Sequence, residues 1–361
     1  MSGTIPRFHR LVVREVRRET PSAVSIAFSV PPHLAADYEF TAGQHVTLRT
    51  TLEGEDVRRS YSICSGPDDG ELRIAVKRVE QGIFSAWLNE TIGAGDEIEV
   101  MTPMGRFGLA ESVGDGRLHV GFAAGSGITP ILAIVRGVLQ REPRSRFFLF
   151  YGNRSAEDVL FAETIQELKD RFLDRFSIFH VFSREERDRP ILNGRLDGEK
   201  VRLLLRSMVP AATIDHAFIC GPSAMIDDLE TTLADLGIAE NRVHVERFVS
   251  ATGGRPRESS ARPAPNAPPK HVALVIVDGK RREVPMAAGE AILDAALRAG
   301  MDLPFACKGG MCATCRAKLV EGAATMDVNY SLEPWELKEG FILTCQARPQ
   351  SERIVVDFDQ L

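Results

Sequence analysis

The sequence predicts a multidomain protein with three successive folds, and three patterns lead to this prediction. Up to about residue 103, apolar residues alternate with polar ones, which is typical of antiparallel strands. From residue 117, short apolar runs alternate with helical periods, which indicates a parallel sheet covered by helices. Near the C-terminus, Cys307, Cys312 and Cys315 stand within nine residues, and Cys345 follows thirty residues later. We therefore expect an antiparallel β-barrel (1–110), a doubly wound α/β domain (111–249) and a cysteine-rich domain (271–361).

Composition limits the class of protein. A chain of 361 residues has room for two or three domains with separate cores. The formal net charge of −6 argues against nucleic acid as a partner, and no apolar run approaches the length of a membrane span. The first residues lack the apolar core of a signal peptide. Four of the six cysteines belong to the C-terminal pattern, and the remaining Cys64 and Cys220 are too far apart in sequence to suggest a disulfide. These features predict a cytoplasmic protein with no membrane partner.

The barrel is predicted from period-2 runs that are separated by glycine and proline turns. About six antiparallel strands are expected, including residues 24–28, 45–49, 72–76 and 97–100. One helical stretch, Phe84–Thr91, interrupts them.

The α/β domain is predicted from the regular succession of its elements. Buried strands are expected at residues 118–123, 147–151, 176–181 and 217–220, with a last strand at 243–248. Helices are expected at residues 128–139, 158–172, 199–208 and 224–236. Residues 250–270, rich in proline, glycine and serine, predict a linker to the cysteine-rich domain.

The cysteine spacing C-x4-C-x2-C…C is the plant-type ligand pattern for a [2Fe–2S] cluster. Four-cysteine zinc sites usually pair their ligands as two short knuckles, whereas here only Cys312 and Cys315 form one. A disulfide framework would need an oxidising compartment. Gly309 and Gly310 lie between the first two ligands and allow close backbone approach and positive φ, which further favours the cluster.

A glycine-rich turn follows the first strand of the α/β domain, at Gly121-Phe-Ala-Ala-Gly-Ser-Gly-Ile-Thr-Pro130. A lone Gly-x-Gly is weak evidence, but its place between a buried strand and a helix predicts a pyrophosphate site. The next strand ends without the acidic residue that receives a ribose hydroxyl. Arg154 and Arg184 stand at strand ends instead, which favours the 2′-phosphate of NADPH, although such arginines are often merely solvated.

A nicotinamide delivers two electrons together, whereas a [2Fe–2S] cluster accepts one. A flavin can divide the pair, so the sequence should contain a flavin site. The barrel offers Arg59-Ser-Tyr61-Ser62, in which arginine suits a pyrophosphate, tyrosine an aromatic ring and serine a polar ring edge. Gln81-Gly-Ile-Phe-Ser85 then opens the short helix and presents free N–H groups.

Four of these motifs together resemble the ferredoxin–NADP reductase superfamily: Arg59-x-Tyr-Ser62, Gly82-x-Phe-Ser85, Gly125-Ser-Gly-Ile-Thr-Pro130 and Cys220-Gly-Pro222. The resemblance covers essentially the whole chain, because one branch of the family ends in a plant-type ferredoxin domain of β-grasp fold. Within that branch, Met326-Asp-Val-Asn-Tyr330, Leu332-Glu-Pro334 and Val355-Val-Asp-Phe-Asp359 resemble reductases that serve di-iron epoxidases of phenylacetyl-CoA.

Several roles are implied by the resemblance alone. FAD is the implied flavin, and its implied contacts are Arg59, Tyr61, Ser62, Val76, Lys77, Gly82, Phe84 and Ser85. The NADPH pyrophosphate would be held by Gly125, Ser126, Gly127, Thr129 and Pro130. Cys220, Gly221 and Pro222 would lie beside the nicotinamide, and Phe248 beside the flavin. Tyr61, Ser62 and Cys220 are the residues expected nearest the chemistry.

We therefore expect an NADPH-dependent reductase that passes electrons through FAD and a [2Fe–2S] cluster to an oxygenase, with the di-iron epoxidase as the favoured recipient. A Rieske-type ring or steroid hydroxylase is the alternative recipient. Two hypotheses of other classes stay open, a non-catalytic FAD and [2Fe–2S] adaptor subunit and a cluster-based redox sensor. Both leave Arg154, Arg184 and the nucleotide turn without a clear purpose.

Overall fold

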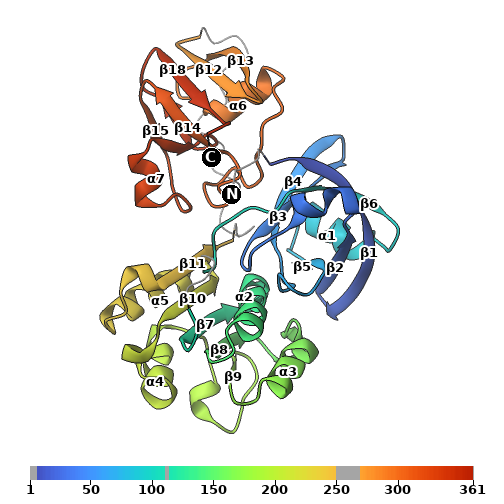
Figure 1. The fold of residues 1–361 in the computed structure, drawn as a ribbon, viewed down its shortest axis with the longest axis vertical. Coiled ribbons are helices and arrows are strands. Elements are labelled where there is room, and N and C mark those ends of the chain that lie inside the picture. Colours follow the sequence, from blue (N-terminus) through green and yellow to red (C-terminus); the bar gives the residue numbers. More distant parts are fainter. Residues whose placement is uncertain (1–5, 110–113, 249–268, 361) are drawn as a thin grey trace. The chain divides into compact units, whose positions relative to one another are not determined.

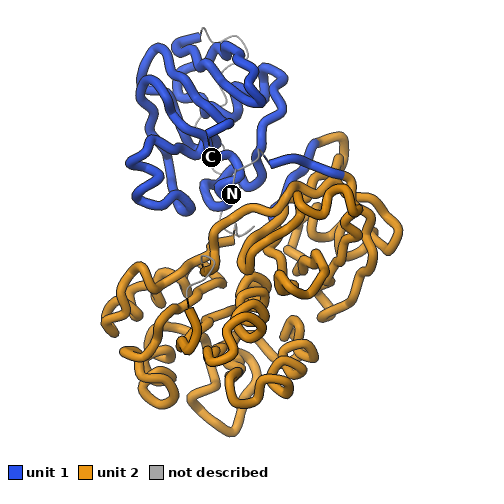
Figure 2. Tube along the Cα trace, in the orientation of Figure 1, with its two compact units in different colours: residues 1–9, 56–60, 249–361 blue, residues 10–55, 61–248 orange. Residues whose placement is uncertain are grey.

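The computed structural model describes residues 6–109, 114–248 and 269–360, and the chain separates into two compact units (Figure 2). One unit comprises Met1–His9, Asp56–Ser60 and Val249–Leu361, and the other comprises Arg10–Glu55 and Tyr61–Phe248. The linker expected at residues 250–270 lies almost entirely outside the described residues, as do residues 110–113 at the expected boundary between the first two domains. Among the described residues, no helix combines the length and the apolar character that crossing a bilayer requires.

The N-terminal part of the chain forms a six-stranded antiparallel sheet in the order β4-β3-β6-β1-β2-β5. Its strands are β1 (Phe8–Thr20), β2 (Ala23–Ser29), β3 (His45–Leu52), β4 (Glu55–Ser62), β5 (Leu72–Lys77) and β6 (Glu97–Met101). A bridge between Ile63 and Ile74 connects the two edges of the sheet, so the strands close into a barrel. Helix α1 (Ile83–Glu90) begins one residue before the expected start and buries Phe84 and Leu88.

The middle of the chain forms a five-stranded parallel sheet in the order β11-β10-β7-β8-β9. Its strands are β7 (Leu118–Ala124), β8 (Arg146–Asn153), β9 (Phe176–Phe182), β10 (His216–Gly221) and β11 (Val243–Arg247). The order reverses after β9, because the chain returns to place β10 beside β7. This reversal is the topological switch point at which ligands bind in such sheets.

Helices cover both faces of this sheet (Figure 1). The helices are α2 (Ile128–Arg141), α3 (Ala162–Arg171), α4 (Gly198–Met208) and α5 (Ser223–Asp235). Side chains of α2 and α3 share one core with the sheet, and those of α4 and α5 share another. Helix α3 begins at Ala162 and not near residue 158. Val159, Leu160 and Phe161 are buried in the segment before the helix, and Phe161 has a φ of 60°, which a helix does not allow.

The C-terminal domain has the expected β-grasp architecture, a mixed sheet in the order β13-β12-β18-β14-β16. Its elements are β12 (His271–Val277), β13 (Lys280–Met286), α6 (Ile292–Arg298), β14 (Arg316–Glu321), β15 (Ala324–Met326), α7 (Pro334–Lys338), β16 (Phe341–Leu343), β17 (Ala347–Pro349) and β18 (Arg353–Asp357). Strands β12 and β18 are parallel neighbours, whereas β15 and β17 form a separate pair. Helix α6 packs its Ile292 and Leu293 into the core of this domain.

Short 3-10 helices complete the described part of the fold: η1 (Pro32–Tyr38), η2 (Gly125–Gly127), η3 (Ala156–Asp158), η4 (Pro190–Leu192), η5 (Ala211–Thr213) and η6 (Glu240–Arg242).

Candidate electron-transfer sites

The expected cluster ligands lie on one loop and one strand end of the C-terminal domain. Cys307, Cys312 and Cys315 belong to the loop between α6 and β14, and Cys345 follows β16. None of the six cysteines forms a disulfide. Among the described residues, no group of three or more histidine, cysteine or acidic side chains gathers around a single point.

The four sulfurs form two pairs. Cys312 donates a hydrogen bond that lowers the pKa of Cys307, and Cys315 does the same for Cys345. Backbone N–H groups of Gly309 and Met311 also point at Cys307 and lower its pKa further. The protein would supply two cysteine thiolates to each iron of a [2Fe–2S] cluster, so the paired arrangement fits this group.

The backbone of the ligand loop is shaped for close approach to sulfur. Gly309 donates its N–H to Cys307 Sγ at 3.3 Å, and Gly310 has a φ of 75°. Lys308 and Ala313 also have positive φ, near 50°, which is strained for a residue with a Cβ. Strain of this kind persists only where the surroundings hold the loop.

Hydrogen bonds from outside the loop hold it. Gln346 Nε2 donates to Lys308 O at 2.8 Å and to Cys345 Sγ at 3.5 Å. Thr344 Oγ1 donates to Cys315 O at 2.9 Å, and Tyr330 N donates to Gly310 O at 3.0 Å. Sequence reasoning did not identify Gln346, although a polar residue directly after the last ligand is a usable signal.

The proposed flavin residues lie on β4 and α1. Tyr61 packs its ring against Phe84, with centroids 6.2 Å apart and an interplanar angle of 25°. Arg59 is exposed, and its guanidinium donates to Arg58 O. Ser62 is buried and donates its hydroxyl to a carboxylate of β11, described below.

The turn before α1 has no room for a larger residue at Gly82. A Cβ at Gly82 would lie 2.8 Å from Ser85 Oγ and 3.0 Å from Val79 Cβ. Ser85 fixes this turn, because its hydroxyl accepts from Val79 N and donates to Gly82 O, each at 3.0 Å. A pocket of about 490 Å³ opens beside the turn, lined by Ser22, Arg78, Val79, Glu80, Gln81, Gly82, Ile83 and Ala86.

Val76 and Lys77 end strand β5 in the same barrel. Val76 is buried, pairs with Val24 and accepts a hydrogen bond from Asn89. Lys77 Nζ lies 3.7 Å from a carboxylate oxygen of Asp158. The structure thus places Lys77 between the barrel and the α/β domain, where a diphosphate would have to compete with Asp158 for its charge.

The glycine turn lies at the switch point, between β7 and α2. Gly125 has a φ of 54°, and a Cβ at this position would meet no atom within 4 Å, so the turn is open to a ligand. Thr129 Oγ1 donates to Ser126 O at 2.9 Å, and Pro130 is buried in the first turn of α2. Tyr151 on β8 stabilises the turn, because its hydroxyl donates to Gly125 O at 3.0 Å. The open space at Gly125 and the N-terminal end of α2 fit a pyrophosphate.

Cys220-Gly-Pro222 ends β10 directly beside that turn. A Cβ at Gly127 would lie 2.1 Å from Cys220 O, so the two motifs touch through their backbones. Cys220 is fully buried, and burial raises the pKa of its thiol. Pro222 is exposed.

Arg154 and Arg184 follow β8 and β9 and are both exposed. Arg184 N donates to Arg154 O at 2.8 Å, so the two residues are neighbours. Neither guanidinium forms an ion pair within the described part of the chain, whereas the nearby Arg187 pairs with Glu185 at 2.8 Å. The pair is therefore available to a phosphate.

The sequence prediction missed Glu246. It lies on β11 opposite Cys220, and Ser62 Oγ donates to its Oε2 at 2.8 Å. Burial raises the pKa of Glu246 to about 8, although the bond from Ser62 opposes the rise. An acidic residue inside the expected last strand, Val243-His-Val-Glu-Arg-Phe248, is the signal that could have found it. Phe248 packs against the core that contains Cys220.

Family models match most of the chain and agree with this geometry. An oxidoreductase FAD-binding domain matches residues 11–108 and an oxidoreductase NAD-binding domain matches residues 122–231. A 2Fe-2S iron-sulfur cluster binding domain matches residues 275–350. The expected FAD, nicotinamide and cluster domains are thereby confirmed, whereas the roles of individual residues stay predictions.

Curated relatives match over nearly the full length. The chain is 45% identical to one component of the 1,2-phenylacetyl-CoA epoxidase of Escherichia coli, over 98% of both chains. It is 33% identical to the ferredoxin reductase component of 3-ketosteroid-9-alpha-monooxygenase of Mycobacterium tuberculosis, over 97% of this chain and 96% of the relative.

Solved structures share the fold. Phthalate dioxygenase reductase aligns over 97% of this chain and 98% of its own, with a TM-score of 0.56 and 23% identity. An intact type IV self-sufficient cytochrome P450 monooxygenase aligns over 97% of this chain and 41% of its own, with a TM-score of 0.70 and 19% identity. The chain belongs to the ferredoxin–NADP reductase superfamily, in the branch of NAD(P)H-dependent oxygenase reductases that end in a [2Fe–2S] ferredoxin domain.

Proposed function

We propose that this reductase draws its electrons from NADPH and delivers them to the di-iron epoxidase that acts on phenylacetyl-CoA. When bound, FAD accepts a hydride and releases its two electrons singly, and the cluster carries single electrons. The observation that supports this best is the convergence of three motifs from distant parts of the sequence. Ser62 contacts Glu246, and Glu246 lies opposite Cys220, whose backbone touches Gly127.

Within this arrangement each residue has a separate task. The turn from Gly125 to Pro130 would hold the pyrophosphate of the nucleotide, and Tyr61 and Phe84 would offer aromatic surface to the flavin. Arg59, which is exposed, would bind the flavin diphosphate. Burial keeps Cys220 protonated, so this residue would shape the nicotinamide site without adding a negative charge.

Ser62 and Glu246 would control protons beside the flavin. With a pKa of about 8, Glu246 is mostly protonated at neutral pH. A protonated carboxyl and a hydroxyl can exchange the donor and acceptor roles of their shared hydrogen bond. The pair is thus suited to hold a proton close to the flavin without placing a fixed charge there.

The preference for NADPH rests on the neighbouring Arg154 and Arg184. A hydrogen bond to a charged group contributes about 1.5–3 kcal/mol, which is about 10- to 150-fold in affinity. Replacing Arg154 with alanine should therefore lower kcat/KM for NADPH by about that factor and leave NADH nearly unchanged. The matched control is Arg187→Ala, because Arg187 lies close in sequence but pairs with Glu185. Equal efficiency of the wild-type protein with both nucleotides would remove this part of the proposal.

The recipient is argued from the relatives. The component of the Escherichia coli phenylacetyl-CoA epoxidase is 45% identical over 98% of this chain, whereas the steroid monooxygenase component is 33% identical. The purified chain should therefore support NADPH-dependent turnover by a phenylacetyl-CoA epoxidase oxygenase component. Turnover only with a Rieske-type oxygenase would transfer the function to the alternative. A chain that cannot reduce ferricyanide with NADPH would instead be an adaptor subunit or a redox sensor.

A further inference from the structure

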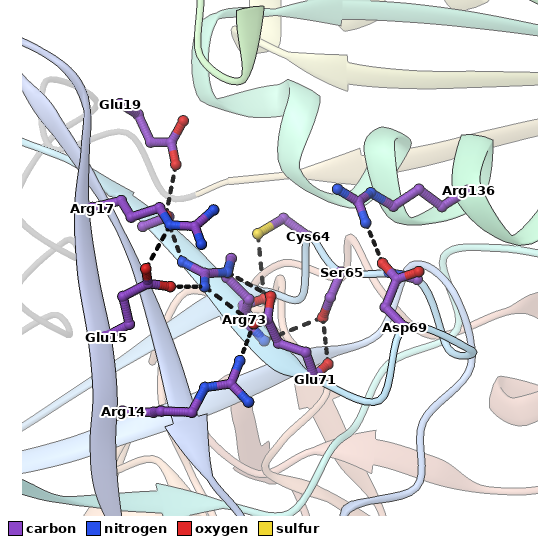
Figure 3. Close-up of polar contacts among 12 residues, drawn as sticks. Arg14, Glu15, Arg17, Glu19, Cys64, Ser65, Asp69, Glu71, Arg73 and Arg136 are labelled. Carbon is purple, nitrogen blue, oxygen red and sulfur yellow. Dashed lines mark hydrogen bonds and ion pairs between the residues drawn. The ribbon is translucent and has the colours of Figure 1, made fainter. Parts of the chain in front are cut away.

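Helix α2 connects the nucleotide turn to the barrel. Its first turn carries Thr129 and Pro130, and its last two turns reach the barrel loop at residues 66–70, which we call the acidic loop (Figure 3). Arg136 and Gln140 bind Asp69. Arg141 binds Asp68 through two hydrogen bonds of 2.6 and 2.7 Å.

Asp69 is the centre of this contact. Its Oδ2 accepts from the backbone N–H of Gly66 at 2.7 Å and from the guanidinium of Arg136, and its Oδ1 accepts from Gln140 Nε2 at 3.0 Å. The Asp69 side chain is only 14% exposed and that of Arg136 is 25% exposed. Half-buried ion pairs with several hydrogen bonds are screened less than exposed ones. Asp69 therefore binds its own loop and the helix together.

The acidic loop is itself fixed to the barrel. Ser65 Oγ, directly before the loop, donates to Glu71 O at 2.7 Å and accepts from Arg73 N at 3.1 Å. The Arg73 guanidinium, 8% exposed, pairs with Glu15 at 2.5 Å and with Glu71 at 2.6 Å. Figure 3 shows Arg73 between these two carboxylates. The loop is thus anchored at both ends.

The helix and the loop approach each other closely beside this pair. Gly137 faces the barrel, and a Cβ at that position would lie 3.5 Å from Ala42 Cβ and 3.8 Å from Pro67 Cδ. A side chain larger than alanine would therefore push the helix away from the barrel. The close approach brings Arg136 and Gln140 within reach of Asp69.

The same contact relates the two nucleotide sites. The flavin motif ends at Ser62, and the chain enters the acidic loop four residues later. On the other side, α2 is continuous from the pyrophosphate turn to Arg136, a distance of about 10 Å at 1.5 Å per residue. A helix of this length is stiff, so a displacement at Asp69 is transmitted to Gly127 and Thr129.

We propose that Asp69 is a positioning residue for hydride transfer, which holds the nicotinamide-binding turn of α2 at a fixed place relative to the flavin motif of the barrel. The inference rests on the function proposed above, because it concerns the transfer between the two groups. A misplacement of about 1 Å can cost about a hundredfold in rate. Asp69 touches neither the donor nor the acceptor and acts through α2.

The test compares Asp69→Asn and Arg136→Gln with Asp68→Asn in the full-length protein. Asp68 is the matched control, because it joins the same loop to the same helix through a pair that is 45–48% exposed. In stopped-flow experiments at saturating NADPH, the first two variants should reduce their flavin about tenfold more slowly, within the range that misplacement allows. The dissociation constant for NADPH should change less than twofold, and Asp68→Asn should resemble wild type.

A second readout does not depend on activity. Hydrogen exchange should become faster in residues 66–70 and in the second half of α2 in Asp69→Asn but not in Asp68→Asn. The double variant Asp69→Asn/Arg136→Gln should be no slower in flavin reduction than either single variant, because both remove the same interaction. Arg136→Gln keeps the bond between Asp69 and Gly66, so it remains informative if Asp69→Asn folds poorly.

Three results would overturn the proposal: wild-type flavin-reduction rates in both variants, an equal loss in the Asp68→Asn control, or a loss that appears only as weaker NADPH binding. Failure of the proposed function is distinguishable from these. In that case the wild-type protein itself would not be reduced by NADPH, while the hydrogen-exchange difference would still report on the contact at Asp69.

Discussion

Substitution of Gly127 by alanine tests how closely the nucleotide turn approaches β10. Gly127 has a φ of −62°, which any residue adopts, so conformational freedom does not explain the glycine. The reason is steric. A Cβ at this position would lie 2.1 Å from the carbonyl oxygen of Cys220, 2.5 Å from its carbonyl carbon and 2.9 Å from Gly221 N.

The size of the effect follows from those distances. Contacts to a Cβ shorter than 3.0 Å are essentially never observed, so the two backbones would have to separate by about 1 Å. The obstructing atoms belong to β10, which is paired with β7 and β11 and cannot move alone. Overpacking of this kind costs about 1–3 kcal/mol in the free energy of unfolding. Displacement of the turn should also weaken NADPH binding by more than about tenfold, or about 1.4 kcal/mol.

The matched control is Gly137→Ala in the same helix. Its Cβ would make only ordinary contacts, at 3.5 and 3.8 Å, and alanine in a helix interior is more stable than glycine by about 0.5–1 kcal/mol. Urea unfolding should therefore shift to lower concentration for Gly127→Ala and to higher concentration for Gly137→Ala. NADPH titration should show a defect only in the first. Unchanged unfolding and unchanged NADPH affinity in Gly127→Ala would refute the steric reasoning.

Four further outcomes are expected. Because burial raises the pKa of Glu246 to about 8, the rate of flavin reduction should change with pH around that value, and this change should disappear in Glu246→Gln. An unchanged pH profile in the variant would exclude a role of Glu246 in holding a proton beside the flavin. The native protein also binds the Glu246 proton more tightly than the unfolded chain does. Because of this residue, the free energy of unfolding measured in a series of urea titrations should fall as the pH rises from 4.5 to about 8. Burial, with the nearby His244 and His119, lowers the pKa of His216 to about 4. The free energy of unfolding should therefore keep the full contribution of neutral His216 above pH 6.5 and fall as the pH drops toward 4. His216→Gln should weaken this dependence, and an unchanged midpoint of acid unfolding would contradict it. Gln346→Leu removes a donor to Cys345 Sγ and should make the cluster potential more negative by redox titration, whereas a rise would contradict the assignment.

The sequence predictions were most specific where they rested on motifs of a few neighbouring residues. The cysteine spacing is a property of one loop, and the glycine turn between a strand and a helix spans ten residues, so both could be recognised without knowledge of the fold. Strand periods were also predictive, since β2, β3, β5 and β6 all cover the expected runs. These features depend on neighbours along the chain, which the sequence displays directly.

Contacts between distant segments could not be read in the same way. Ser62 and Glu246 are 184 residues apart, and their contact joins the end of β4 in the barrel to β11 in the α/β domain. The ion pair between Lys77 and Asp158 likewise depends on how the barrel meets the α/β domain. Asp69 stands in the polar stretch Gly66-Pro-Asp-Asp-Gly70, and only the position of α2 reveals its partners.

The start of α3 shows a different limit. The apolar residues Val159, Leu160 and Phe161 fit a helical period, but they are buried in the loop that precedes the helix. Periodicity cannot distinguish the buried face of a helix from a short buried segment of three apolar residues outside a helix. The structure distinguishes them through the positive φ of Phe161.

An anaerobic stopped-flow experiment on the purified chain tests the central claim most directly, with wild type compared to Cys312→Ser. Mixing wild type with NADPH should bleach the flavin absorbance first and the ferredoxin-like absorbance afterwards, and the oxygenase component should then be reduced. Cys312→Ser should still bleach its flavin and reduce ferricyanide but should leave the oxygenase oxidised. A variant that reduces the oxygenase as fast as wild type, or a wild-type protein without iron and flavin, would contradict the account.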